Sequence, residues 1–230
     1  MVKSPAIVWE RMSASPPRRR AVYAKIAAAA TALADKGSLD DVSIRNLAQR
    51  LQSGTMSLYR YVSSKDDLWD LMLDAVFAEI ALPAKSSRNW RRDVIQVAIE
   101  TRRMMLRHAW LAGLVTARPT LGPNYLRWFE FLLKTTSTAS ADIRVRVRVI
   151  GAMWAYTSGF VGHELGEQAT TRRIRLTEAQ KRASVEPYLQ QLLATRNFPH
   201  LAEFIANYSA GNPDEEFEFG LRALLKGLVQ

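Results

Sequence analysis

One stretch of sequence decides the fold. It reads Ser43-Ile44-Arg45-Asn46-Leu47-Ala48-Gln49-Arg50-Leu51, then Gln52-Ser53-Gly54, then Thr55-Met56-Ser57-Leu58-Tyr59-Arg60-Tyr61-Val62. In the first segment the apolar residues recur at helical spacing, and Ser43 stands where a side chain can cap a helix. The segment Gln52–Gly54 breaks that helix, and a second short helix follows as far as about Val62. Two short helices joined by a tight turn predict a helix-turn-helix motif.

The second helix of this motif has two unlike faces. At 100° per residue, Leu58 and Val62 share one face, whereas Met56 and Arg60 point the opposite way. A recognition helix needs this arrangement, because its inner face anchors it while its outer face reaches base edges in DNA. The predicted base-reading residues are Thr55, Met56, Ser57 and Arg60. We expect Ser43, Tyr59, Tyr61 and Lys65 to contact the phosphate backbone, and Arg45 completes the predicted DNA-binding set.

Composition excludes several classes of protein. The chain has 230 residues, 48% of them hydrophobic, and no cysteine. Disulfides, thiolate metal sites and cysteine nucleophiles are therefore ruled out, which suits a reducing cytosol. The longest apolar run, Val149–Gly162, is shorter than the ~18 residues needed to span a bilayer. These features predict a soluble cytoplasmic protein with a sizeable core and no membrane partner.

The formal net charge of +10 favours a polyanionic partner without locating its binding site. Most of the excess lies in residues 83–182, where 18 basic residues face 7 acidic ones. A smaller basic excess lies in Arg18–Lys65, around the helix-turn-helix motif. The cluster Arg18–Arg20 either follows the minor groove of DNA or is a solvated charge run before a helix.

Helical periodicity continues along the rest of the chain, so the predicted fold class is all-α. Ser64 and Asp67 have the spacing of a capping box at the start of a fourth helix. The alternation in Ile143–Val149 is typical of a strand, but a strand without a partner leaves its backbone groups unsatisfied, and we therefore expect helix there. A polar loop is expected between Gly166 and Leu176. The predicted helices are Arg18–Lys36, Ile44–Leu51, Thr55–Val62, 65–82, Trp90–His108, Trp110–Ala117, Pro123–Thr136, Ala141–Glu167, Thr177–Ala194 and Pro213–Leu228.

Residues Asp41–Leu51 and Gly54–Leu68 resemble the DNA-binding domain of the tetracycline-repressor (TetR) family of transcriptional regulators. The resemblance depends on Leu58-Tyr59, the aromatic Tyr61 and the Ser-Lys-Asp that follows, and it covers Arg18–Ile80. It implies a three-helix DNA-binding head, a helical body that binds a small effector, and a homodimer. In such a dimer the helices Ala141–Glu167 and Pro213–Leu228 would pair across a two-fold axis.

The chain departs from the family pattern in the turn. The family usually has a glycine and then an apolar residue where this chain has Gln52 and Ser53. A non-glycine residue in a left-handed conformation costs on the order of 1 kcal/mol. The turn is therefore expected to be either reshaped or less stable, with DNA binding retained.

The resemblance sets the domain organisation. It implies a DNA-binding domain over residues 18–64 and a ligand-binding and dimerisation domain over residues 83–230, with a fourth helix over 65–82 connecting the two. Pro5, Pro16 and Pro17, together with the lack of sustained periodicity, predict a flexible N-terminal arm over residues 1–17. An effector pocket is usually apolar with a few polar groups, although aromatic residues at helical spacing are more often ordinary core. The candidate effector-binding residues are Trp110, Trp128, Phe131, Trp154 and His163, which favour an apolar or aromatic effector.

The predicted function is a sequence-specific repressor that a small molecule releases from a palindromic operator, with no cofactor, metal or catalytic residue. An all-α enzyme is a rival interpretation, and His163 with Glu167, one helical turn on, is its acid–base candidate. His163-Glu164-Leu165-Gly166-Glu167 resembles the start of a zinc-protease helix, but Glu167 stands in place of the second histidine. A nucleoid-type binder without an effector is the other alternative, and it predicts sequence-indifferent binding with a steep salt dependence.

Overall fold

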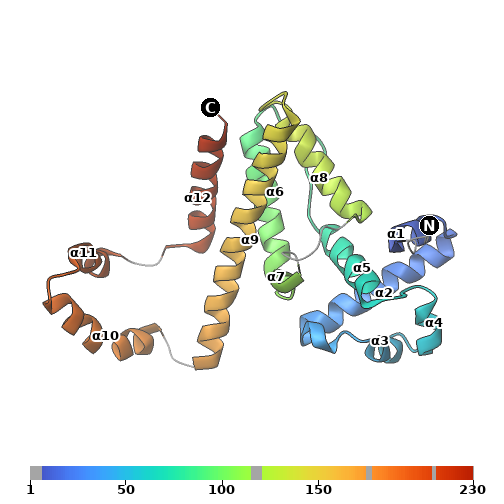
Figure 1. Cartoon of the computed structure of the whole chain (residues 1–230), viewed down its shortest axis with the longest axis horizontal. Helices are drawn as coiled ribbons and strands as arrows, with labels where there is room; N and C mark the ends of the chain where they lie inside the picture. The colour runs from blue at the N-terminus through green and yellow to red at the C-terminus, as the bar shows by residue number, and fades with distance from the viewer. Residues whose placement is uncertain (1–6, 115–120, 175–177, 209–210, 230) are drawn as a thin grey trace, which may run out of the picture.

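The structure is a computed structural model that describes residues 7–114, 121–174, 178–208 and 211–229. Within these ranges every regular element is a helix, which confirms the all-α prediction. Figure 1 shows a head, a body of long helices beside it, and a lateral segment that extends away from the body. No helix in the described part of the chain is long and apolar enough to cross a membrane.

The head consists of five α-helices and one 3-10 turn. Its elements are α1 (Val8–Ser13), α2 (Pro17–Lys36), η1 (Leu39–Asp41), α3 (Ile44–Arg50), α4 (Thr55–Tyr59) and α5 (Lys65–Phe77). Helix α2 packs along α5, and its buried face includes Tyr23, Ile26 and Ala30. The alanines of α2 combine strong helix propensity with little bulk, so the two helices approach closely.

Helix α1 lies within the segment expected to be a flexible arm. Its Val8 is fully buried, and Arg11 forms an ion pair with Asp67 of α5. The expectation of an arm is therefore wrong for Val8–Ser13, because tertiary contacts hold a helix too short to be stable by itself. Residues 1–6 lie outside the described residues.

The turn between α3 and α4 keeps a left-handed residue without glycine. Gln52 has a φ of 51°, in the region that normally favours glycine. The amide of Ser53 donates to the carbonyl of Ala48, which closes the end of α3. Gln52 therefore keeps a left-handed conformation, and the lower stability expected from it stays a prediction.

The start of α5 is capped in a slightly different way from the predicted box. Ser64 Oγ accepts from the Asp67 amide at 3.1 Å, as predicted. The Asp67 carboxylate accepts instead from the Ser63 amide, at 2.7 Å, and also binds Arg11. Asp67 thus joins α1 to the head as well as capping α5.

The body is built from α6 (Trp90–Arg107), α7 (Leu111–Leu114), α8 (Pro123–Thr136), α9 (Ile143–Ile174) and α12 (Pro213–Leu228). Helices α6, α8, α9 and α12 pack around a core that includes Trp128, Met104 and Phe217. Ile143–Val149 is helical, as predicted. Helix α9 continues to Ile174, so the loop expected after Gly166 is wrong for Glu167–Ile174. The last part of the predicted helix Trp110–Ala117 lies outside the described residues.

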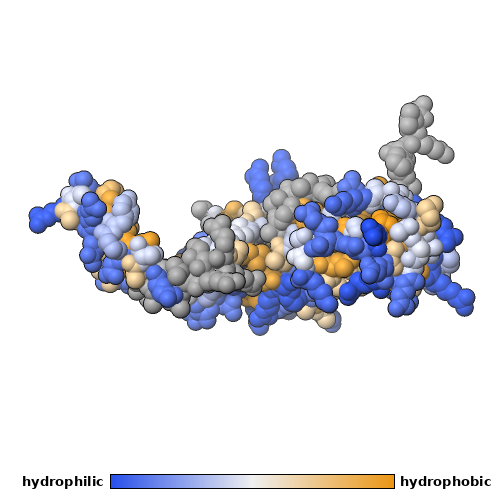
Figure 2. All heavy atoms as spheres, turned by 90° about the horizontal axis from the view of Figure 1, so that it is seen from below, coloured by the Kyte–Doolittle hydropathy of each residue, from blue (hydrophilic) through white to orange (hydrophobic). Residues whose placement is uncertain are grey.

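Helices α10 (Glu178–Ala194) and α11 (Pro199–Asn207) form the lateral segment. Helix α11 was not predicted from the sequence. Figure 2 shows that this segment stands clear of the rest of the chain, with hydrophobic side chains among hydrophilic ones on its surface. The exposed hydrophobic residues of the segment are Val185, Tyr188, Phe198, Phe204, Ile205 and Tyr208.

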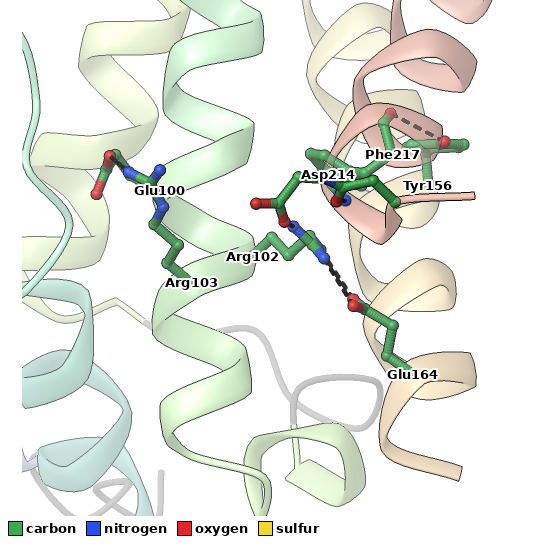
Figure 3. Close-up of polar contacts among 8 residues, drawn as sticks. Glu100, Arg102, Arg103, Tyr156, Glu164, Asp214 and Phe217 are labelled. Carbon is green, nitrogen blue, oxygen red and sulfur yellow. Dashed lines mark hydrogen bonds and ion pairs between the residues drawn. The ribbon is translucent and has the colours of Figure 1, made fainter. Parts of the chain in front are cut away.

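A buried arginine ties three body helices together. The guanidinium of Arg102 on α6 binds Glu164 of α9 through two hydrogen bonds, of 2.8 and 2.6 Å, and Asp214 at the start of α12 at 2.6 Å (Figure 3). It also lies against the rings of Phe160 and Phe217. The hydrogen bonds that Arg102 donates to Glu164 raise the pKa of its guanidinium above the usual value, despite the opposing effect of burial. The body is thus fixed by a charge-paired cation as well as by apolar packing.

Candidate nucleic-acid interface and head–body junction

Helix α4 presents two different faces, as the sequence predicts. Leu58 is 4% exposed and Val62 is 1% exposed, so both anchor the helix to the head. On the opposite side Met56 is 77% exposed, and Arg60, the C-cap of α4, is also exposed. Thr55 is exposed and Ser57 half-buried. The predicted base-reading side chains therefore share one accessible face of a helix that is anchored by its other face.

The predicted backbone-contacting residues surround this face. Ser43 caps α3, with its Oγ accepting from the Asn46 amide at 3.1 Å, and Arg45 is exposed one residue into that helix. Tyr59 is 52% exposed. Lys65 is exposed at the start of α5, with its Nζ 5.0 Å from the centre of the Trp69 ring. These placements match the predicted positions, and their contacts with DNA remain predictions.

Arg19 contacts the end of the candidate recognition helix. Its Nη2 donates to the carbonyl of Arg60 at 3.1 Å, and its guanidinium lies 5.2 Å from the centre of the Tyr61 ring. Tyr61 in turn packs edge-on against Tyr23, with 5.3 Å between ring centres. Arg18–Arg20 thus belong to the first turns of α2 rather than to an extended arm. Arg18 and Arg19 line a hollow of about 420 Å³ that also includes Arg60.

A second group of polar residues joins head and body. The imidazole of His108, at the end of α6, is 6% exposed and lies between two carboxylates. Its Nδ1 is 2.8 Å from Asp35 Oδ1 of α2, and its Nε2 is 3.1 Å from Glu79 Oε1, just after α5. The indole of Trp110 also donates to Asp35, at 2.7 Å.

Glu79 takes part in this junction through hydrogen bonds with Arg107 and His108. Burial raises the pKa of the Glu79 carboxyl, but hydrogen bonds from Arg107 and His108 outweigh it, so that pKa lies below its ordinary value. Sequence patterns do not predict this junction. Asp35 and His108 are 73 positions apart, and no spacing rule relates them.

The predicted effector-binding residues do not form one site. Trp128 and Trp154 pack together with Phe77, Trp128 being buried and Trp154 half-buried. Phe131 is half-buried on α8, against the same core. Trp110 lies instead at the head–body junction. We refer to Phe77, Tyr125, Trp128 and Trp154 as the aromatic cluster.

His163 departs most from its predicted role. Its side chain is 74% exposed, and its Nε2 lies 3.4 Å from Oε1 of Glu167, whose side chain is 68% exposed. The two groups share a helix face, as predicted, but that face is open to solvent. A pocket position for His163 is therefore wrong, and the acid–base pair of the enzyme interpretation lies on an exposed helix face. Within the described ranges no three His, Asp or Glu residues are grouped to hold a metal ion.

Comparison with known proteins assigns the chain to a family. Residues 82–230 match the family model "Tetracyclin repressor-like, C-terminal domain". An HTH-type transcriptional regulator of Saccharopolyspora erythraea is 35% identical over 98% of this chain and 92% of its own length. The chain belongs to the TetR family. It is therefore a transcriptional regulator of the helix-turn-helix type, as the resemblance of residues 41–68 implies.

Other TetR relatives are similar to this chain over most of its length. The HTH-type transcriptional repressor DrrR1 of Streptomyces coeruleorubidus is 32% identical over 96% of this chain and 83% of its own length. Apo ActR of Streptomyces coelicolor superposes with a TM-score of 0.74 at 27% identity, covering 90% of this chain and 93% of its own. ActR in complex with actinorhodin gives a TM-score of 0.72 at 27% identity, covering 90% and 95%. The fold and the family of this TetR regulator are thus established over head and body together.

Proposed function

We propose that the protein is a homodimeric repressor that binds a palindromic operator through α4 and leaves it when a small apolar or aromatic effector binds. It acts in the cytoplasm and binds its effector without turning it over. The observation that carries the proposal is the outer face of α4, where Met56, Ser57 and Arg60 lie together on a helix held by Leu58.

The chemistry of these side chains suits the major groove. An arginine can donate two hydrogen bonds to O6 and N7 of guanine, and an apolar group can contact a thymine methyl. Arg60 and Met56 are placed for these roles, and Ser57 adds a small hydrogen-bonding group. Arg18, Lys65 and the hydroxyl of Tyr59 would hold phosphates on either side, because such contacts fix the register of the helix on DNA.

The outer surfaces of α9 and α12 support a dimer. A side chain added at Gly151, Gly159 or Gly162 of α9 would point into open space. Phe219 of α12 is 73% exposed, although Phe217 and Leu221 on the same helix are fully buried in the chain's own core. A row of small residues lets another helix approach closely, and an exposed phenylalanine favours burial. We infer that two copies pair through these helices, which would place two α4 helices on successive major grooves about 34 Å apart.

Two relatives support repression and the binding of a ligand. DrrR1 is named a repressor, and solved structures of ActR hold actinorhodin or (S)-DNPA. In this chain the aromatic cluster and Phe131 offer apolar surface between α5, α8 and α9. An effector bound there would favour a dimer whose head separation no longer fits the operator, to an extent set by its differential affinity for the two forms.

Selection of bound sequences from a random pool of duplex DNA tests the proposal. We expect a consensus with two-fold symmetry and half-sites one helical turn apart. Light scattering of the purified chain should give twice its mass of 25.9 kDa. Enrichment of no consensus, together with a steep salt dependence of binding, would instead identify a sequence-indifferent nucleoid-type binder.

A further inference from the structure

A cavity of about 410 Å³ lies between the head and the body. Its walls come from α1, α2, α5 and the start of α8. Among its described lining residues none belongs to the aromatic cluster and none to α4. It is therefore separate from both the proposed effector surface and the DNA-reading face.

The shape of the cavity follows from small side chains on two neighbouring helices. Ala28 of α2 and Ala75 of α5 line it, while Trp9 and Met12 of α1 close one side. Alanines leave the walls apolar but do not fill the space between them, and tryptophan offers a flat apolar ring. A volume of this size is at the lower end of the range for small-molecule sites, which suits a molecule of one or two rings.

Two charged residues interrupt the apolar lining. The exposed Arg20 of α2 contributes a cation that keeps its charge at any physiological pH. Asp74 of α5, which is 5% exposed, contributes a carboxylate. A ligand that complements both carries a negative charge and a hydrogen-bond donor.

Hydrogen bonds from the start of α8 hold the Asp74 carboxylate in place. Its Oδ1 accepts from the amides of Asn124 and Tyr125, at 2.7 and 3.1 Å, and so caps the start of α8. Its Oδ2 accepts from Asn124 Nδ2 at 2.8 Å. A carboxylate oxygen can accept two hydrogen bonds. Within the described part of the chain Oδ2 accepts only this one, which leaves capacity for a donor from the cavity.

We propose that this cavity binds a small hydroxylated aromatic acid, with the carboxylate of the ligand paired to Arg20 and its hydroxyl donating to Asp74. The ring system lies between the alanines of α2 and α5 and against Trp9. This site goes beyond the proposed function, and its occupancy does not depend on DNA binding.

Calorimetric titration of the full chain without DNA tests the site. The probe is 6-hydroxy-2-naphthoate, which carries a carboxylate and a hydroxyl at opposite ends of a two-ring system. Its matched controls are 2-naphthol, which lacks the carboxylate, and 2-naphthoate, which lacks the hydroxyl. We expect one site per chain with a Kd below about 1 mM, and weaker binding of either control.

Two variants probe the lining directly. Ala28→Phe places a ring in the cavity from an exposed helix position, and Arg20→Met keeps an apolar stem without the charge. Each should raise the Kd of 6-hydroxy-2-naphthoate about tenfold or more, because a charge-assisted bond or the binding volume is lost. Arg20→Met should leave the affinity for 2-naphthol unchanged. Arg18→Met, in the same turn of α2 but outside this cavity, is the matched control and should change the Kd less than about twofold.

Three results would overturn the proposal. The first is no saturable binding of the probe to the wild-type chain below about 1 mM. The second is unchanged affinity in Ala28→Phe while Trp154→Phe, in the aromatic cluster, weakens binding, which would place the ligand at the proposed effector surface. The third is equal loss in Arg18→Met and Arg20→Met, which would indicate attraction to the basic surface alone. Circular dichroism of each variant separates loss of binding from loss of folding, and the operator selection is unaffected by any of these results.

Discussion

Nδ1 of His108 lies 2.8 Å from Oδ1 of Asp35, across the boundary between body and head. Asp35 is in the last turn of α2, and Arg19, in the first turns of the same helix, donates to the carbonyl of Arg60. Helix α2 has 20 residues, which makes it about 30 Å long. One rigid helix thus contacts the body at one end and the recognition helix at the other. We expect a shift of the end of α6 to reach α4 through this helix.

Replacing Asp35 tests the junction. Asp35→Ala removes the acceptor of the buried Trp110 indole and one partner of His108. Because a buried donor without a partner is costly and Asp35 is partly exposed, the free energy of unfolding should fall by about 1–2 kcal/mol. Urea denaturation measures the change. Asp40→Ala, at an exposed position of η1, is the control and should stay within about 0.5 kcal/mol of wild type. An equal loss of unfolding free energy in Asp35→Ala and Asp40→Ala would show that Asp35 has no special role at the junction.

Two variants of α4 test DNA recognition. Arg60→Ala and Tyr59→Ala should each weaken specific operator binding, Arg60→Ala by about tenfold to a hundredfold, because a bidentate contact with guanine is worth about 1–3 kcal/mol. The dimer should stay intact, since both residues lie in the head and not on α9 or α12, through which the dimer is proposed to form. Gel-shift titration measures affinity and light scattering measures mass. Arg144→Ala, an exposed arginine of α9, is the matched control. Retained operator affinity in both α4 variants would refute the assignment of the recognition helix.

The left-handed conformation of Gln52 predicts a stabilising substitution. Glycine reaches a φ of 51° without the clash of a Cβ, so Gln52→Gly should raise the free energy of unfolding by up to about 1 kcal/mol. The greater freedom of glycine in the unfolded chain offsets part of this gain. Thermal and urea unfolding measure the difference, with Ser53→Gly beside it as the control. A less stable Gln52→Gly variant would mean that the Gln52 side chain makes a compensating contact.

Asp74 predicts a pH dependence of stability. Burial raises the pKa of its carboxyl above the ordinary value of 3.8, and the hydrogen bonds from Tyr125 and Asn124 oppose this effect only in part. The folded protein therefore holds a proton at pH values where the unfolded chain has lost it. The contribution of Asp74 to the free energy of unfolding is therefore complete below pH 3.8. It is lost as the pH rises through the raised pKa of the carboxyl in the folded state.

The non-titrating variant Asp74→Asn isolates this effect. We expect the free energy of unfolding of wild type, relative to Asp74→Asn, to fall as the pH is raised from about 4 through the mildly acidic range and then to level off. Urea denaturation of both proteins at a series of pH values provides the measurement. A relative stability that rises with pH would show that the hydrogen bonds to α8 dominate over burial.

The Arg102 network predicts an unequal response of two glutamates on α9. Glu164→Ala leaves Arg102, whose side chain is 5% exposed, with Asp214 as its remaining partner in the network. Removing one partner of a buried ion pair is costly, so the free energy of unfolding should fall by about 3 kcal/mol. Glu167→Ala, one turn on and exposed, should cost less than about 0.5 kcal/mol. Denaturation of both variants at the same protein concentration measures the two losses. Equal losses in Glu164→Ala and Glu167→Ala would contradict a specific role for Glu164.

Spacing in the sequence predicts most of the helices and the two faces of α4. Leu58 is buried and Met56 is exposed because helical geometry places them on different sides, and the spacing of the two residues in the sequence fixes that difference. For Ile143–Val149 the local alternation is typical of a strand, and helix is expected only because a strand there would have no partner in the chain. Local reasoning alone does not resolve that segment. It failed at α1, which is held by Val8 and Arg11 against residues that are remote in the sequence. It also failed after Gly166, where polar residues continue α9.

Which distant groups meet depends on how the helices pack. Trp110 and Trp128 have the same chemistry, yet one donates to Asp35 at the junction and the other packs in the aromatic cluster. His163 shares a helix face with Glu167, as periodicity requires, but the packing of α9 leaves that face in solvent. A helix repeat fixes the direction of a side chain relative to its own axis, whereas burial and charge pairing depend on where the other helices lie.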